Sequence, residues 1–375
     1  MSKPLLTFLF IDATIAGGAE RTTFNIINHL SRKGYSIAVI SLFASNQKTF
    51  FPLDKEIQFY SINNKPTSKY IFFPIEKYLI DYFPVIIGLR RLLKKIKPVI
   101  VFSVAINPSI YYEAASIGLS GIKEVVCEHG DLDNTINHDR LSKWARVLGV
   151  KFGHSVLLLT EENRCKYNAY FKSKIKRSWV IPNAIPIKVD ECNALDQPIA
   201  IAIGRFVPEK GFERMVDIWF SVVQVKPTWK LKIIGDGPLK ESIMQIVRFK
   251  QLEDYIIIEP ATLEIESYYR NASIFIMTSH FEGLPMVLLE AMEHGIPIVA
   301  FDCPSGPRQI IKDNEDGFLI TNNDNEQFVA KIIKLVEDDT LRKQMGKKAK
   351  NNIQRFSTTQ IVPLWENMIN SILNE

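Results

Sequence analysis

The sequence lacks any long hydrophobic run. Its apolar runs are about 7 residues long, whereas a transmembrane helix needs about 20 apolar residues, so a polytopic membrane protein is excluded. Residues 5–11, LLTFLFI, imitate a signal peptide, but no small-residue cleavage site follows them, and we expect a buried strand there. With 46% hydrophobic and 23% charged residues, the composition is that of a folded globular protein and not of a disordered or collagen-like chain.

Cysteine is also scarce. The chain has no CxxC pair, and its four cysteines are Cys127, Cys165, Cys192 and Cys303. Their wide spacing excludes a disulfide scaffold, argues against a zinc site and suits a reducing cytosol. We also expect no metal at His280 and His294, which are 14 residues apart.

Acidic residues are few in the first half of the chain. Residues 1–188 carry 26 Lys and Arg against 14 Asp and Glu, a net charge of +12, whereas residues 189–375 carry 20 against 27, a net charge of −7. This asymmetry indicates that the first half faces an anionic partner: a nucleic acid, a membrane surface or a phosphate-bearing substrate. A nucleic acid is the weakest candidate, because no basic stripe is interleaved with aromatic residues.

Strand and helix patterns alternate along the chain, which indicates parallel α/β structure. In the first half we expect a helix over 19–33 and strands over 5–11, 37–43, 99–103, 123–127, 156–160 and 178–182. In the second half the strand-like segments are IAIAIGRF, WKLKIIGDG, YIIIEP, SIFIMTS, IPIVAF and GFLI. The polar segment 183–198 between the halves has two prolines and no periodicity, as expected of a linker. We therefore predict two doubly wound Rossmann-like domains, 1–187 and 188–356, and an amphipathic helix within 357–375.

Ligands of doubly wound sheets bind beyond the carboxyl ends of the strands, so a cleft between the two domains is the expected site. Gly17 and Gly18 follow the first strand and open the first helix. Glycines let the backbone approach a phosphate, and a helix N-terminus offers N–H groups to it. A plain tight turn is the alternative.

Two cations follow the first strand of the second half. Arg205 and Lys210 lie five residues apart between Gly204 and Gly211. A planar guanidinium and a compact ammonium both suit a diphosphate, and solvated surface charge is the alternative.

The segment 281–290, FEGLPMVLLE, follows another strand. Pro285 fits a first helical turn, so we expect a helix from there to His294. Its N-terminal N–H groups, at residues 283–287, are available to an anion. Glu282 and Glu290 could accept hydrogen bonds from sugar or ribose hydroxyls, and a capped helix with two surface acids is the alternative.

Three further features allow two interpretations each. The loop 303–308, CPSGPR, follows a strand and ends on Arg308, but a simple turn has the same pattern. His129 follows the strand 123–127 and is either structural or functional. The helix 84–97 carries five cations and either covers the sheet or lies on an anionic membrane.

With these motifs the second half resembles glycosyltransferase family 4, which comprises retaining enzymes of the GT-B fold. The resemblance rests on Gly204-Arg205 with Lys210-Gly211, on IGDGP at 234–238, on Glu282 and Glu290 as an E-x7-E pattern, and on GFL at 317–319. GGAE at 17–20 and VIPN at 180–183 resemble family segments in the first half. The loop 303–308 looks like that of bacterial surface-polysaccharide transferases that use UDP-sugars.

The resemblance implies a role for each candidate residue. The second domain would bind a nucleotide-sugar donor, with UDP as the nucleotide, and the first domain, to which the C-terminal helix crosses back, would bind the acceptor. Arg205 and Lys210 would neutralise the leaving diphosphate, and Glu290 would bind the ribose. Glu282 would hold the donor sugar and phosphate together with the N–H groups of Gly283, Leu284, Met286 and Val287.

In the first domain, the resemblance implies that His129 contacts the donor sugar. Gly17 and Gly18 would let this domain close near the phosphates and the acceptor. No divalent ion is implied, because side-chain cations and helix dipoles would supply the electrostatic stabilisation.

We therefore expect a retaining glycosyltransferase that moves a hexose or N-acetylhexosamine from a UDP-sugar to a lipid-linked or surface-glycan acceptor. Capsule, O-antigen or lipopolysaccharide assembly at the inner face of the cytoplasmic membrane would be its setting. A UDP-sugar epimerase of similar build and a catalytically silent transferase partner are the alternatives. An epimerase needs further acid/base residues, and a silent partner should lack Arg205, Lys210 or Glu290, all of which are present.

Overall fold

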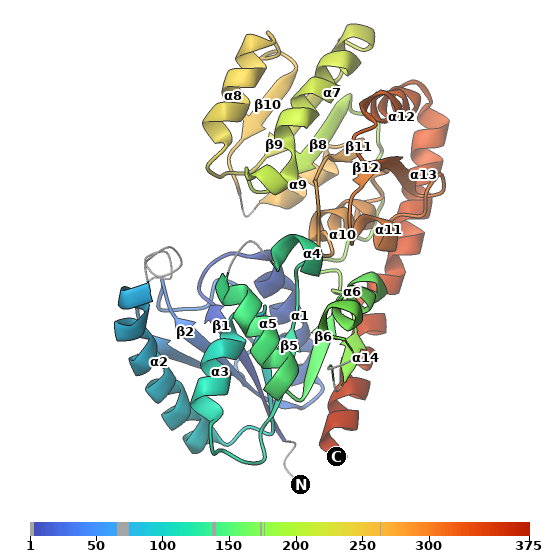
Figure 1. Cartoon of the computed structure of the whole chain (residues 1–375). Coiled ribbons are helices and arrows are strands. Elements are labelled where there is room, and N and C mark those ends of the chain that lie inside the picture. The colour runs from blue at the N-terminus through green and yellow to red at the C-terminus, as the bar shows by residue number, and fades with distance from the viewer. Residues whose placement is uncertain (1–3, 66–74, 137–139, 173–174, 176, 263) are drawn as a thin grey trace. The chain divides into compact units, whose positions relative to one another are not determined.

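The computed structural model describes the whole chain except residues 1–3, 66–74, 137–139, 173–174, 176 and 263 (Figure 1). The chain folds into two compact units. Unit 1 comprises Met1–Pro186 with Thr358–Glu375, and unit 2 comprises Ile187–Ser357. The C-terminal helix α14 (Thr358–Leu373) therefore belongs to the same unit as the N-terminus.

Unit 1 contains a seven-stranded parallel sheet in the order β3-β2-β1-β4-β5-β6-β7. The strands are β1 Leu5–Asp12, β2 Ser36–Phe43, β3 Gln58–Asn63, β4 Ile100–Val104, β5 Lys123–Cys127, β6 Ser155–Leu158 and β7 Ser178–Val180. Because the chain order reverses between β1 and β4, the carboxyl ends of these strands form a topological switch point, where ligands of open α/β sheets bind.

Helices cover both faces of this sheet (Figure 1). One face packs against α1 (Gly18–Arg32) and α14, with Trp365 of α14 against the stacked rings of Phe8 and Phe102. The other face is covered by α2 (Ile75–Ile96), α3 (Pro108–Ser116) and α5 (Arg140–Phe152). The short helix α4 (Leu132–Thr135) and α6 (Glu161–Phe171) follow β5 and β6.

Unit 2 contains a six-stranded parallel sheet in the order β10-β9-β8-β11-β12-β13. The strands are β8 Ile199–Ile203, β9 Lys230–Ile234, β10 Ile256–Glu259, β11 Ile274–Met277, β12 Ile298–Asp302 and β13 Gly317–Thr321. Both sheets are doubly wound, so the predicted fold class is confirmed.

The core of unit 2 lies between this sheet and three helices, α7 (Phe212–Val225), α8 (Lys240–Phe249) and α12 (Asn325–Glu337). On the other face, Tyr269 stacks on Phe275 of β11. The remaining helices are η2 Pro208–Lys210, α9 Ile265–Arg270, α10 Met286–Glu293, α11 Pro307–Ile310, α13 Asp339–Asn352 and η3 Ile353–Phe356.

Two expectations need correction. The edge strand β3 is not among the expected strands, because its half-exposed sequence QFYSIN lacks a continuous apolar run. Helix α2 begins at Ile75, with Pro84 in its interior and not at its start. The segment 183–198 is irregular and contains the boundary between the units at 186/187, as predicted for a linker, although Ala184, Ile185, Val189 and Leu195 in it are buried.

Candidate functional site

In unit 2, the loops that follow β8 and β11 bring Lys210 and Glu282 together. The Lys210 ammonium donates to Glu282 Oε1 over 2.7 Å, and the Ser279 hydroxyl donates to the same oxygen over 2.6 Å. The Glu282 side chain is 10% exposed and the Lys210 side chain 23% exposed. An ion pair at the carboxyl ends of the strands is thus held in place but still open to solvent.

Gly211 makes the close approach of these two loops possible. Its φ of 61° lies in the left-handed region, and a Cβ there would sit 2.3 Å from the Thr278 carbonyl oxygen. Thr278 in turn donates its hydroxyl to the Gly211 carbonyl over 2.9 Å. Any other residue at 211 would push the Lys210 loop away from the loop that carries Glu282.

Arg214, on the first turn of α7, holds the backbone of the loop after β11, which carries Glu282. Its Nε and Nη2 donate to the carbonyls of Thr278 and Ser279, each over 2.6 Å, and its guanidinium lies 4.2 Å from the centre of the Phe301 ring. Burial lowers the pKa of Arg214 to about 10, so the group stays charged at neutral pH. The backbone that leads to Glu282 is therefore rigid on both sides.

Helix α10 starts at Met286 with Pro285 as its N-cap, one residue later than expected. The first N–H groups of a helix have no acceptor inside it, and here the Leu288 N–H already donates to the Pro285 carbonyl over 3.1 Å. Glu282 lies four residues before the start of the helix. Glu290 lies farther along, is 3% exposed, and accepts a hydrogen bond from the Tyr269 hydroxyl over 2.8 Å. The fully buried His294 ring stacks on Tyr269 at 5.2 Å.

A small pocket in unit 2 lies beside the Lys210–Glu282 pair. Its polar lining includes Lys210, Ser279 and Glu282, and its floor is formed by apolar residues such as Ile203 and Val287. Its volume of about 10 Å³ is far below that of a typical ligand pocket, so the candidate site is defined by its converging polar groups.

The loop 303–308 packs against Glu282 and Pro285. The Pro304 carbonyl accepts the Glu282 N–H over 3.3 Å. At Gly306, with φ 72°, a Cβ would lie 2.6 Å from Pro285 Cδ. Burial raises the pKa of the Cys303 thiol to about 12, which excludes a thiolate at neutral pH. Arg308 pairs with Asp302 over 2.8 Å.

Arg205 is arranged differently from Lys210. Its side chain is 79% exposed and lies 3.8 Å from the Glu209 carboxylate. Gly204, beside it, packs tightly against the loop after β9, since a Cβ on Gly235 would lie 1.9 Å from the Gly204 carbonyl. The backbone of this loop is thus fixed, whereas the Arg205 side chain reaches into solvent.

In unit 1, a buried network surrounds the loop that carries His129. Glu128, 3% exposed, accepts from Arg146 Nε over 2.6 Å, from the Tyr167 hydroxyl, and from the Gly130 N–H over 3.0 Å. Arg146 Nη2 also donates to Thr135 Oγ1 over 2.7 Å. Side chains from α5 and α6 therefore fix both ends of this loop.

His129 is half-buried within the loop. Burial lowers its pKa to about 4, against the opposing effect of Glu128, so the imidazole is neutral at pH 7. Among the described residues its Nδ1 has no hydrogen-bond partner. A buried polar atom without a protein partner is one that a ligand or water can satisfy.

The loop after β1 is fixed by an acid that sequence reasoning did not single out. Asp12, 2% exposed, accepts from the N–H and hydroxyl of Thr14 and from the N–H and hydroxyl of Ser45. Gly17 has an extended backbone, and a Cβ on Gly18 would meet no atom within 4 Å. Open space at Gly18 is compatible with the approach of a ligand.

Two family models match the chain. The model described as "Glycosyltransferase Family 4" matches residues 16–189, and "Glycosyl transferases group 1" matches residues 187–352. The chain belongs to glycosyltransferase family 4. It is therefore a glycosyltransferase, as expected from its motifs.

The relatives of this chain include bacterial glycosyltransferases. An uncharacterized glycosyltransferase of Haemophilus influenzae is 29% identical over 96% of this chain and 99% of its own length. The amylovoran biosynthesis glycosyltransferase AmsD of Erwinia amylovora is 27% identical over 95% of this chain and 96% of its own length. Among solved structures, a complex of S. aureus TarM with fondaparinux, alpha-GlcNAc-glycerol and UDP has a TM-score of 0.80 and 17% identity, covering 97% of this chain and 99% of that one. The glycosyltransferase thus has the GT-B fold.

The structure adds residues to the candidate site that the glycosyltransferase motifs do not contain. Ser279 and Tyr269 contact the two motif carboxylates, and Arg146 and Tyr167 contact Glu128 next to His129. Ser279 is only three residues before Glu282, which was a usable signal. Tyr269 is 21 residues from Glu290 and Tyr167 is 39 residues from Glu128, so only the fold reveals those contacts.

Proposed function

We propose that this glycosyltransferase transfers a hexose or N-acetylhexosamine from a UDP-sugar to a lipid-linked or surface-glycan acceptor, with retention of the anomeric configuration. The observation that carries the proposal is the Lys210–Glu282 pair at the start of α10. It joins the family's two donor motifs in one pocket of unit 2.

Unit 2 binds the donor in this proposal. Lys210 neutralises the diphosphate, with Arg205 moving in from solvent when the nucleotide is bound. The first-turn N–H groups of α10, with those of Gly283 and Leu284, face the phosphate and the sugar. Glu282 accepts hydrogen bonds from sugar hydroxyls and Glu290 from those of the ribose. The nucleotide is UDP by analogy with TarM, whose complex contains UDP.

Unit 1 binds the acceptor and supplies His129. The neutral imidazole of His129 offers one donor and one acceptor to the donor sugar without adding a positive charge next to the oxocarbenium-like centre. Gly17 and Gly18 leave room for the phosphates or the acceptor beside α1.

The reaction needs no protein nucleophile in this proposal. The bond between the anomeric carbon and the β-phosphate oxygen breaks, and UDP leaves with the electron pair. The acceptor hydroxyl oxygen forms the new bond on the same face of the sugar, and its proton passes to the β-phosphate oxygen. Side-chain cations and helix N–H groups stabilise the charge that develops on the phosphate, so no divalent ion is required.

The acceptor is proposed from the relatives. AmsD is named for amylovoran biosynthesis, and the TarM complex contains alpha-GlcNAc-glycerol. A bacterial surface polysaccharide presents the same sugar hydroxyls, and a lipid-linked precursor adds phosphate groups. The net charge of +12 over residues 1–188 favours such an anionic acceptor on unit 1.

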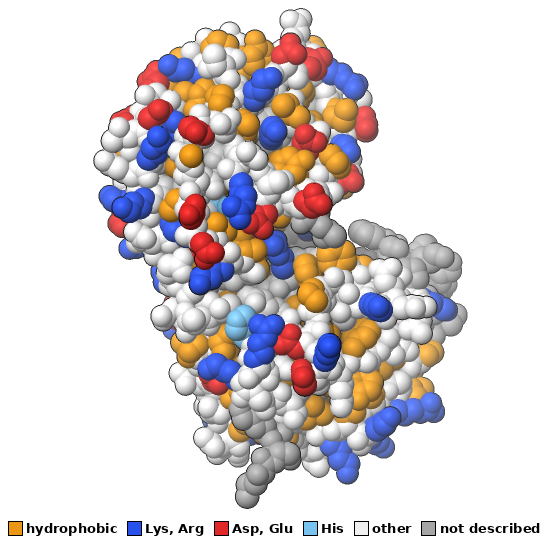
Figure 2. Space-filling view, turned by 180° about the vertical axis from the view of Figure 1, so that it is seen from behind, with side chains coloured by type: hydrophobic (Ala, Val, Ile, Leu, Met, Phe, Trp, Pro, Cys, Tyr) orange, Lys and Arg blue, Asp and Glu red, His pale blue; other side chains and the backbone are white. Residues whose placement is uncertain are grey.

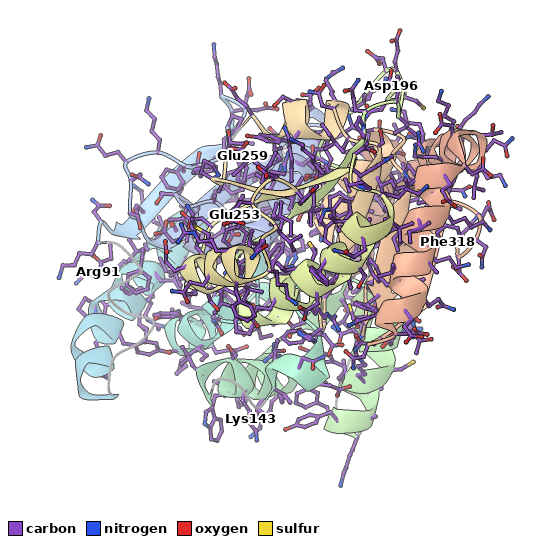
Figure 3. All side chains as sticks on the ribbon, turned by 90° about the horizontal axis from the view of Figure 1, so that it is seen from above. Arg91, Lys143, Asp196, Glu253, Glu259 and Phe318 are labelled. Atoms are coloured by element: carbon purple, nitrogen blue, oxygen red, sulfur yellow. The ribbon has the colours of Figure 1, made fainter. Side chains whose placement is uncertain are left out.

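We further propose that unit 1 associates with the anionic inner face of the cytoplasmic membrane. No described helix is long and apolar enough to cross a bilayer. Helix α2 exposes Phe83 and Ile87, followed by Arg91, Lys94 and Lys95. Figure 2 shows blue side chains along the edge of unit 1 where α2 runs, and Figure 3 shows Arg91 pointing away from the ribbon.

The five expected cations of this helix are not all available. Arg90 donates its Nη1 to the carbonyls of Ala115 and Ile117, over 2.8 and 2.6 Å, at the end of α3. Its role is to hold two helices together, because the guanidinium satisfies carbonyls that a helix end leaves open. Lys97 lies after the last residue of α2, Ile96. The membrane proposal therefore rests on Arg91, Lys94 and Lys95 of the helix.

A donor screen tests the proposed function. The purified protein is incubated with UDP-, GDP- and ADP-sugars, and donor hydrolysis and thermal stabilisation are measured, each with and without EDTA. We expect stabilisation and slow hydrolysis with one or more UDP-sugars, unchanged by EDTA. Stabilisation by another nucleotide alone, or activity that EDTA abolishes and magnesium restores, would contradict the proposal.

A further inference from the structure

We infer that helix α5 is a second membrane contact of unit 1, which inserts Trp144 and Phe152 into the interfacial layer of an anionic bilayer. This inference rests on the proposed membrane association and names the surface that makes it. Trp144 is 62% exposed and Phe152 is 55% exposed, the largest apolar side chains that α5 turns outward.

The aromatic residues form a stripe along the helix. Trp144, Leu148 and Phe152 are spaced by four residues, which places them on one side of an α-helix. Leu148 is half-buried between the two exposed rings. Lys143 and Lys151 flank the stripe and are exposed, with the Lys151 ammonium 5.0 Å from the centre of the Phe152 ring. Figure 3 shows Lys143 pointing away from the body of unit 1.

The opposite side of α5 is firmly packed, so the exposed stripe does not result from a loose helix. Arg146 pairs with the buried Glu128, and Ala145 is fully buried. A Cβ on Gly149 would lie 2.8 Å from Val126 Cγ2, so the helix sits directly on β5. The outward rings therefore have a fixed position on the surface.

The charge of α5 indicates which kind of partner binds the aromatic stripe. The sequence of α5, RLSKWARVLGVKF, has no acidic residue. Arg146 is buried in its pair with Glu128, so Lys143 and Lys151 are the cations that the structure shows exposed beside the stripe. A helix with Trp, Leu and Phe on one side and lysines beside them has the composition of an interfacial helix, which combines apolar insertion with attraction to anionic headgroups. Tryptophan in particular favours the level of the headgroups. An anionic lipid surface therefore fits the stripe better than an acidic or an uncharged protein surface of fixed shape.

Intrinsic fluorescence gives a direct test, because Trp144 is the one strongly exposed tryptophan of the five in the sequence. The full-length protein is mixed with vesicles of phosphatidylglycerol and phosphatidylcholine, or of phosphatidylcholine alone. With anionic vesicles we expect a blue shift and quenching by brominated lipids, both absent in the W144F variant. Emission that stays unchanged while the protein co-sediments would overturn the inference.

Three variants separate the contributions. The double variant Trp144→Ala, Phe152→Ala should weaken vesicle binding by roughly tenfold, since the affinity for a membrane increases with the apolar area that a protein inserts into it. Phe249→Ala, which removes an 88% exposed ring from unit 2, should leave binding unchanged. The triple change of Arg91, Lys94 and Lys95 to Gln should weaken binding at low salt through α2.

The outcomes are distinguishable from those of the proposed function. If only the triple variant loses binding, α5 is not a contact and this inference fails, while the membrane proposal stands. If no variant or wild type binds anionic vesicles, both membrane statements fail, and donor hydrolysis still decides the transferase proposal. If Trp144→Ala converts a dimer to a monomer in light scattering, the stripe is a contact between copies and the inference is overturned.

Discussion

The Lys210 ammonium lies 2.7 Å from the Glu282 carboxylate, although the two residues are 72 positions apart and follow different strands. The pair links two family motifs. Such preorganisation places a cation where a leaving phosphate gains charge, and the surrounding loops need little reorganisation to use it. Ser279 and Arg214 hold the two loops that make the pair possible.

The Tyr269 hydroxyl is predicted to support nucleotide binding through Glu290. Tyr269→Phe removes the 2.8 Å hydrogen bond to a carboxylate that is 3% exposed, which costs about 1 kcal/mol or more. We expect UDP affinity to fall by roughly fivefold, measured by titration calorimetry. Tyr268→Phe is the matched control on the adjacent position. Equal affinities of both variants and the wild type would remove Tyr269 from the nucleotide site.

The Tyr167 hydroxyl is predicted to affect turnover through the His129 loop. Tyr167→Phe removes one hydrogen-bond donor from the buried Glu128. A buried acceptor that loses its donor is costly, so we expect the loop that carries His129 to be held less firmly. We expect kcat to fall about tenfold, with a smaller change in donor KM. Tyr82→Phe removes another hydroxyl of unit 1, which donates to the Ile110 carbonyl over 3.2 Å, and should leave kcat unchanged. If His129→Ala turns over normally, this role of the network is refuted.

A buried carboxyl pair predicts a pH dependence of stability. Burial is the main reason why the pKa of Glu124 is raised well above its ordinary value, and the neighbouring Glu113 raises it further. The hydrogen bond donated by the Ser103 hydroxyl acts in the opposite direction and lowers this pKa. The folded state therefore favours the protonated form, and this stabilisation is present below the unfolded pKa of about 4.5 and is lost as pH rises toward the folded pKa. Above that range the folded state contains a buried carboxylate.

Glu124→Gln checks this dependence, because a glutamine keeps the shape and the hydrogen bond but cannot ionise. We expect the variant to gain at least about 1 kcal/mol over the wild type at pH 8, and less at pH 5. Urea unfolding at both pH values measures it. A gain that does not change with pH would show that ionisation of Glu124 is not involved.

Most of the fold was predictable from the sequence, because buried parallel strands leave continuous apolar runs such as residues 5–11 and 199–203. The strand β3 was not, since all of its side chains are half-exposed or exposed and it has no continuous apolar run. Helix α2 was predicted too short because Pro84, which suits a helix start, lies inside it. Proline in a helix interior costs several kcal/mol locally, and packing of Val85, Leu89 and Leu93 against the sheet offsets that cost.

The candidate site was predictable only where its motifs are local. Glu282 and Lys210 are each marked by nearby glycines, but their contact depends on strand order. Asp12 illustrates the limit: its four hydrogen bonds to Thr14 and Ser45 join loops after β1 and β2. An isolated aspartate at the end of an apolar run has no signal that distinguishes it from a turn residue.

The central claim is that Lys210 stabilises the diphosphate of a UDP-sugar, and a matched pair of lysines tests it. Lys210 and Lys226 both belong to unit 2, and each lies 2.7 Å from a glutamate, Glu282 and Glu337 respectively. Their side chains are 23% and 28% exposed. Lys226 follows α7 and precedes β9. It therefore lies on a connection that enters a strand and not on a loop at a carboxyl end, and it controls for the loss of a cation and of an ion pair.

The decisive measurement is the release of UDP from a UDP-sugar by wild type, Lys210→Ala and Lys226→Ala, with thermal unfolding as a check that all three are folded. The account predicts that Lys210→Ala lowers turnover by about 10²- to 10³-fold, the cost of a lost transition-state contact, while Lys226→Ala keeps wild-type turnover. Unchanged turnover in folded Lys210→Ala, or an equal loss in both variants, would contradict it.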